Sequence, residues 1–173
     1  DKEIDNIEQV RTEVSKRAAL ELVNRCSASV LTMLFNEYND ILCFDTSMSF
    51  YDEYVKNNVS AVLSAVAKKK YDSLEKADRA FFENSFIYAV NSAESYARIG
   101  ELLESNAAAV GELFDYGKYN SLTASEKADY LSYVSKMNIT SFDMLSGALT
   151  GYKKGASSSG ASVSGKGSAN TTV

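Results

Sequence analysis

The stretch IDNIEQVRTEVSKRAALELVNRCSASVLTMLFNEYNDIL, residues 4–42, decides the fold class of this chain. It contains neither glycine nor proline, and its apolar or small residues recur at steps of three and four. That spacing places them on one face of a helix with 3.6 residues per turn. The residues on this face are Ile4, Ile7, Val14, Ala18, Leu22, Cys26, Ser29 and Met33, with Val10 and Val30 beside them. The pattern predicts a long amphipathic helix.

Two forms of this helix fit the pattern. Unbroken, it would reach roughly 58 Å at a rise of 1.5 Å per residue, a length typical of a bundle or of an elongated assembly subunit rather than of a compact globule. A bundle helix that breaks once, near Asn24 or Asn36, fits equally well. Arg11 interrupts the apolar face. We therefore expect its stem to lie along that face, or the helix to pack against more than one neighbour.

Composition limits the kinds of partner. Charged residues make up 24% of the 173 residues and hydrophobic residues 45%, as in an ordinary folded domain. The net charge is −5, and because residues 154–173 hold two lysines and no acids, residues 1–153 carry −7. An acidic body predicts no binding to nucleic acid, whose phosphates require basic surfaces. No apolar run approaches the ~20 residues of a membrane span, which predicts no transmembrane segment.

The missing residue types exclude several chemistries. The chain has no histidine, which removes Ser-His-Asp and Cys-His catalysis and the Glu-x-x-His di-iron motif. Glu94, Glu101 and Glu104 follow helical spacing, which is typical of a solvated acidic face. The segment GASVSGK at 160–166 matches a phosphate-binding loop in letters, but no strand precedes it and no helix follows. We predict a non-catalytic protein with no catalytic, cofactor-binding or metal-binding residues and no cofactor.

The two cysteines, Cys26 and Cys43, lie 17 residues apart. On a continuous helix they would be separated by roughly 25 Å along the axis, whereas a disulfide requires Cα atoms within about 7 Å. They should therefore not pair with each other unless the helix breaks between them. We expect two buried free thiols that act as small hydrophobic side chains.

Further helices follow along the chain. Ser49 and Asp52 resemble a weak capping box before a helix over 50–69, and Asp72 or Ser73 is expected to cap the next. This third unit starts near Leu74 and continues to about residue 114, with a weak point at Ser105–Asn106. A capping box at Thr123–Glu126 opens a fourth helix, and a last amphipathic stretch covers 142–152. Small residues at Ala89, Ala93, Gly100 and Ala107 predict a close approach by another helix.

These elements predict an all-α fold. We expect an antiparallel bundle of four to five helices over residues 1–153, with an unusually long first helix. Residues 154–173 are rich in glycine and serine, a composition typical of flexible linkers. We expect this segment to form an extended C-terminal arm that a neighbouring subunit holds in place.

The expected function is that of a non-catalytic structural or assembly protein, a subunit of a virion or surface filament. Its partners would be copies of itself or other subunits, contacted through the long first helix and the C-terminal arm. The chain begins at Asp1 rather than Met, which predicts that a signal, a lipoprotein anchor or another upstream segment was removed. The alternative is a secreted or lipid-anchored helical binding module with the arm as a spacer; an enzyme ranks third. The location favoured is extracellular, surface-attached or virion.

Overall fold

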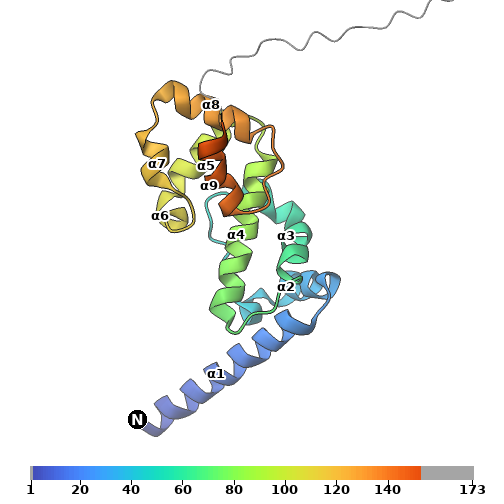
Figure 1. Ribbon diagram of the computed structural model, residues 1–173. Helices are drawn as coiled ribbons and strands as arrows, with labels where there is room; N and C mark the ends of the chain where they lie inside the picture. Colours follow the sequence, from blue (N-terminus) through green and yellow to red (C-terminus); the bar gives the residue numbers. More distant parts are fainter. Residues whose placement is uncertain (1, 153–173) are drawn as a thin grey trace, which may run out of the picture.

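The computed structural model describes residues 2–152, with side chains from residue 7 onward. This part of the chain is all-helical, with nine α-helices and no strand, which confirms the predicted fold class (Figure 1). The α-helices are α1 (Lys2–Arg25), α2 (Ala28–Leu42), α3 (Val59–Val66), α4 (Leu74–Ser92), α5 (Tyr96–Ser105), α6 (Ala107–Val110), α7 (Tyr116–Ser121), α8 (Ala124–Val134) and α9 (Phe142–Gly151). The predicted arm, residues 154–173, and the domain boundary before it lie outside the described residues.

Residues 4–42 form two helices, so the interrupted form of the predicted helix is confirmed and the continuous form is wrong. The break falls at Cys26 and Ser27, close to Asn24. Ser27 adopts an extended backbone conformation, and its hydroxyl accepts a hydrogen bond from the Val30 N–H, which starts α2. A second irregularity follows inside α2, where Tyr38 leaves helical geometry at φ −142° and ψ 39°.

The second predicted helix, 50–69, is regular only in its second half. It opens with a π-turn, η1 (Tyr51–Val55), and a 3₁₀ turn, η2 (Lys56–Asn58), before α3 begins. The expected capping box at Ser49 does not form. Instead, the Ser49 hydroxyl lies 3.0 Å from Oδ1 of Asn106, far along the chain.

The third predicted unit is divided twice. The expected break at Asn106 is confirmed, since α5 ends at Ser105. An earlier break separates α4 from α5 because Ala93 is extended and the Ser95 hydroxyl accepts from the Arg98 N–H to start α5. The expectation of four to five helices is therefore not confirmed. By contrast, the capping box at Thr123–Glu126 is present as predicted and opens α8.

The core follows α4, which runs between the N-terminal and C-terminal helices (Figure 1). On the N-terminal side, Phe81 of α4 stacks on Phe44 with ring centroids 4.9 Å apart. On the C-terminal side, Phe86 stacks on Phe142 of α9 at 5.3 Å. Phe81 and Phe86 are both completely buried. Helix α4 therefore joins the two ends of the molecule through one continuous apolar core.

Three asparagines fix loops to helices by binding a backbone N–H and C=O at once. The side-chain amide of Asn91, at the end of α4, donates to the Ile139 carbonyl at 2.7 Å and accepts from the Ile139 N–H at 2.9 Å. These contacts satisfy backbone groups that no helix pairs. The three pairs are Asn24 with Tyr71, Asn39 with Phe44, and Asn91 with Ile139.

Both cysteines are free thiols. Cys26 is partly buried against the core, but Cys43 is exposed, so the expectation of two buried thiols is wrong for Cys43. The reason is its position after the last turn of α2, where the backbone turns away with φ 58° and ψ 30°. The left-handed residue closes the helix end, and its Sγ donates to the carbonyls of Asp40 and Ile41, at 3.3 and 3.6 Å, instead of packing in the core.

Candidate interaction surface

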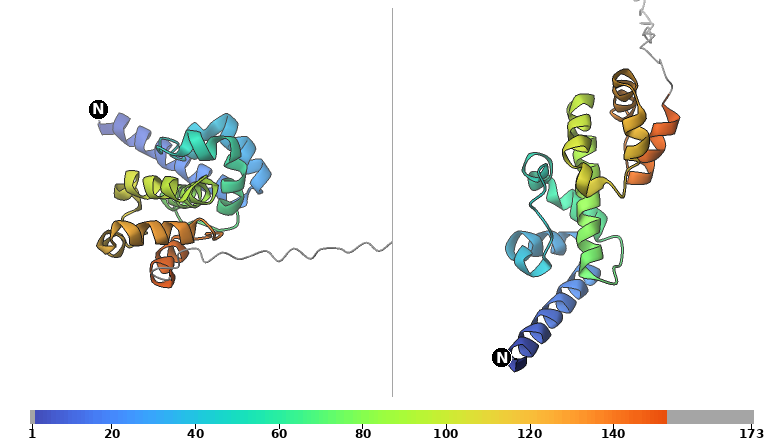
Figure 2. Two further views of the ribbon diagram at one scale, coloured as in Figure 1. Left: turned by 90° about the horizontal axis from the view of Figure 1, so that it is seen from above. Right: turned by 90° about the vertical axis from the view of Figure 1, so that its left-hand side faces the viewer.

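The N-terminal half of α1 projects from the rest of the molecule (Figures 1 and 2). Its apolar side chains are open to solvent: Ile7 is 58% exposed, Val10 56% and Val14 63%. We call these three residues the α1 strip. The predicted apolar face of the first helix is therefore present, but in this half it covers no core within residues 7–152.

Helix α1 reaches the core through its opposite side. Ala19 and Val23 are its buried residues, at 0% and 1% exposure. At about 100° per residue, Val23 lies roughly 180° around the helix from Val14. Rotating α1 cannot bury the α1 strip without exposing Val23. A second neighbour is needed to cover this face.

An apolar groove lies where α1 meets α2. It has a volume of about 250 Å³, and the surface that lines it is entirely apolar. We call it the α1–α2 groove; its lining residues are Leu22, Leu34, Tyr38, Ile41 and Leu42. Leu22, Tyr38 and Ile41 are each more than a third exposed. Exposed apolar surface of this kind marks sites of interaction with other molecules.

Charge is distributed unevenly along α1. Residues 2–13 hold four acids and two bases, a net charge of −2, whereas residues 14–25 hold three bases and one acid, a net charge of +2. Glu8 and Arg17 are exposed, and neither forms an ion pair within the described part of the chain. The helix therefore carries an acidic half and a basic half, both open to solvent.

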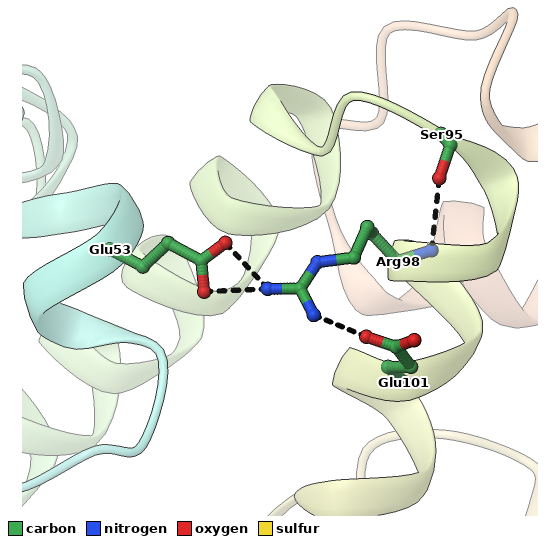
Figure 3. A network of polar contacts seen from close by, with 4 residues as sticks. All are labelled: Glu53, Ser95, Arg98 and Glu101. Carbon is green, nitrogen blue, oxygen red and sulfur yellow. Dashed lines mark hydrogen bonds and ion pairs between the residues drawn. The ribbon is translucent and has the colours of Figure 1, made fainter.

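The most extensive exposed ionic network lies elsewhere, between η1 and α5 (Figure 3). The Arg98 guanidinium donates to both carboxylate oxygens of Glu53, at 2.6 and 2.7 Å, and also contacts Glu101. The hydrogen bonds from Arg98 lower the pKa of Glu53, and those to Glu53 raise the pKa of Arg98. The charge of Arg98 is thus already balanced by two carboxylates. We interpret this network as a structural link between helices, not as a ligand site.

A cluster of tyrosines near α8 is the other candidate for chemistry. Burial raises the pKa of Tyr116 and of Tyr119 to about 12, so both phenols stay neutral near pH 7. The Lys127 ammonium lies 4.4 Å from the Tyr119 ring centroid and 3.9 Å from a Glu104 oxygen. Tyr119 is 1% exposed and packs among other aromatic rings. These residues form core rather than a general acid or base.

The acidic residues singled out in the sequence do not form one site. Glu101 pairs with Arg98, Glu104 lies beside Lys127, and Glu94 precedes α5 in the loop after α4. In the described residues, no group of three or more His, Cys, Asp or Glu side chains is placed to hold a metal ion. Among the helices described here, none is both long and apolar enough to cross a membrane.

Sequence reasoning found the face that contains the α1 strip but not its exposure, and it missed the α1–α2 groove. One signal was available: α2 carries apolar residues on more than one side, including Leu34 and Ile41 in addition to the buried Leu31. The break at Ser27, which brings α1 and α2 together at the groove, could not be placed from apolar spacing alone.

Comparison of this chain with protein-family models, with curated proteins and with solved structures found no match.

Proposed function

We propose that this chain is a non-catalytic structural or assembly protein, a subunit of a larger particle such as a virion or a surface filament. In this proposal, neighbouring subunits are contacted through α1 and through the C-terminal arm, while the other helices act as the bundle that carries them. The observation that carries the proposal is the α1 strip. It is apolar, exposed, and on the side of the helix opposite to Val23 and the core.

The energetics favour a partner on this surface. Ile7, Val10 and Val14 each keep more than half of their surface in water. Covering each of them is worth about 1 kcal/mol or more. Ion pairs and hydrogen bonds along the acidic and basic halves of α1 would add specificity rather than affinity.

The arm has a composition suited to the same role. Residues 154–173 contain two lysines and no acids, while residues 1–153 have a net charge of −7. A basic, Gly/Ser-rich segment can follow an acidic neighbouring surface with little steric hindrance.

The test is the mass of the full chain in solution, measured by light scattering over a range of concentrations. We expect oligomers, and we expect the combined change Ile7→Ser, Val10→Ser and Val14→Ser, or deletion of residues 155–173, to reduce their mass. The control is Gln9→Ser with Thr12→Ser, which changes exposed residues of α1 outside the α1 strip. Circular dichroism should show equal helix content. A monomer in every case would contradict the proposal.

A further inference from the structure

We propose that the partner on α1 is a second copy of this chain, with the two α1 helices antiparallel and the Ile7 end of each helix lying over the α1–α2 groove of the other. This inference rests on the proposed function, because it requires that α1 is an assembly contact. It adds the identity of the partner and the direction of the contact.

The charge pattern of α1 favours this direction. The net charge is −2 over residues 2–13 and +2 over residues 14–25. In an antiparallel pair, the acidic half of each helix lies against the basic half of the other, and the helix dipoles oppose each other favourably. In a parallel pair, like charges would meet along the full length.

The positions of the apolar residues fit the same pairing. Ile7 and Leu22 are 15 residues apart on α1, which is roughly 22 Å along the axis. A two-fold axis near Val14 and Ser15 places Ile7 of one copy opposite Leu22 of the other. Leu22 also lines the α1–α2 groove. The Ile7 side chain of each copy therefore lies at the α1–α2 groove of the other copy. Such an interface is closed and self-complementary.

The projecting shape of α1 leaves room for this contact. The N-terminal half of α1 extends beyond the other helices in Figure 1 and in the right-hand view of Figure 2, so the body of a second copy has space at that end. The C-terminal arm of the same chain is a poor alternative occupant. Residues 154–173 contain only two side chains larger than alanine that are apolar, Val163 and Val173.

Cysteine cross-linking of the full chain distinguishes the possible arrangements. In a background with Cys26→Ala and Cys43→Ser, three single-cysteine chains are made: Ile7→Cys, Val14→Cys and Leu22→Cys. We expect Val14→Cys to form a disulfide with itself. Ile7→Cys and Leu22→Cys should cross-link when mixed but not alone, because the two Ile7 positions of an antiparallel pair lie roughly 22 Å apart. Self-linked Ile7→Cys would show a parallel pair and overturn the inference.

Ionic strength provides a second readout. In the antiparallel pair, the acidic half of each α1 lies against the basic half of the other, so added salt should screen this attraction and weaken the dimer. Sedimentation of the full chain at low and at high salt measures the change. A dimer that tightens or stays unchanged as salt is added would contradict the antiparallel pairing.

The two proposals fail in different ways. If the α1 strip controls oligomer mass but the mixed Ile7→Cys and Leu22→Cys chains do not cross-link, α1 contacts another surface and only the antiparallel inference is overturned. If the full chain is monomeric at every concentration, the assembly function itself is contradicted.

Discussion

Gly100 of α5 lies against Leu131 of α8, so that a Cβ atom placed on the glycine would lie 3.0 Å from Cδ1 of the leucine. Both residues are buried or nearly so. The absence of a side chain at Gly100 lets the two helices approach closely. We expect Gly100→Leu to overpack this contact and to lower the free energy of unfolding by about 1–3 kcal/mol, measured by urea denaturation.

A matched control is available in α9. Gly147 is also inside a helix, but a Cβ atom there would meet nothing within 4 Å. Gly147→Ala should therefore raise the free energy of unfolding by about 0.5–1 kcal/mol through helix propensity alone. Gly100→Ala should gain less than this, because its Cβ atom would lie 3.0 Å from Cδ1 of Leu131. Equal effects of alanine at positions 100 and 147 would show that the close approach to Leu131 is unimportant.

The pairing of Asn91 with the Ile139 backbone should be a strong local contribution to stability. Asn91→Ala leaves an N–H and a C=O of a buried residue without their partner. We expect a loss of about 1–3 kcal/mol in the free energy of unfolding. Asn91→Asp retains the acceptor for the N–H but places a carboxylate against the Ile139 carbonyl, so it should not rescue. A loss below that of an exposed control such as Asn120→Ala would contradict this role.

The left-handed backbone at Cys43 predicts a stabilising substitution. With φ at 58°, a side chain at this position is strained, and glycine is free of that strain. We expect Cys43→Gly to raise the free energy of unfolding by about 0.5–1 kcal/mol and to remove the faster-reacting thiol in a titration with a thiol reagent. Cys43→Ala is the control that removes the thiol but keeps the strain.

Removing the hydroxyl group should change the free energy of unfolding differently at two buried tyrosines, Tyr130 and Tyr119. The Tyr130 hydroxyl donates to the Leu145 carbonyl at 3.0 Å, whereas the buried Tyr119 hydroxyl has no hydrogen-bond partner in the described structure. Tyr130→Phe should cost about 1 kcal/mol of unfolding free energy, and Tyr119→Phe should be neutral or stabilising. Thermal melts of the two variants compare them directly. A clear loss with Tyr119→Phe would show that its hydroxyl is satisfied.

The same cluster predicts loss of stability in alkali. Burial raises the pKa of Tyr116 and Tyr119 to about 12 from the ordinary tyrosine value of 10.0. Between these values the unfolded chain releases protons that the folded chain retains, so the free energy of unfolding falls as pH rises from about 10 to about 12. Urea unfolding over this range, with phenolate absorbance recorded in parallel, should show the buried phenols ionising only as the chain unfolds. Titration of every tyrosine near its ordinary pKa without unfolding would contradict the burial.

Local signals in the sequence were sufficient to predict the all-α fold class and the first residues of several helices. The Thr123–Glu126 capping box is found where the sequence predicts it, and Ser73 is the one of the two predicted caps, Asp72 or Ser73, that starts α4. The break at Ser27 could not be placed from the sequence, because the spacing of three and four residues continues across it from Leu22 to Met33. The weak capping box predicted at Ser49 does not form because the Ser49 hydroxyl donates to Oδ1 of Asn106 instead. No local sequence pattern predicts a partner so far along the chain.

The sequence by itself determined that residues 2–152 are all-helical, because the absence of proline and the spacing of apolar residues act within single helical turns. It also determined the opposite charges of the two halves of α1. Only the tertiary structure decided which apolar residues become core. Val23 is buried and Val14 is exposed on the same helix, because the rest of the chain covers one side of α1 and leaves the other free. That choice depends on contacts with distant residues, and it creates the surface on which the proposed assembly rests.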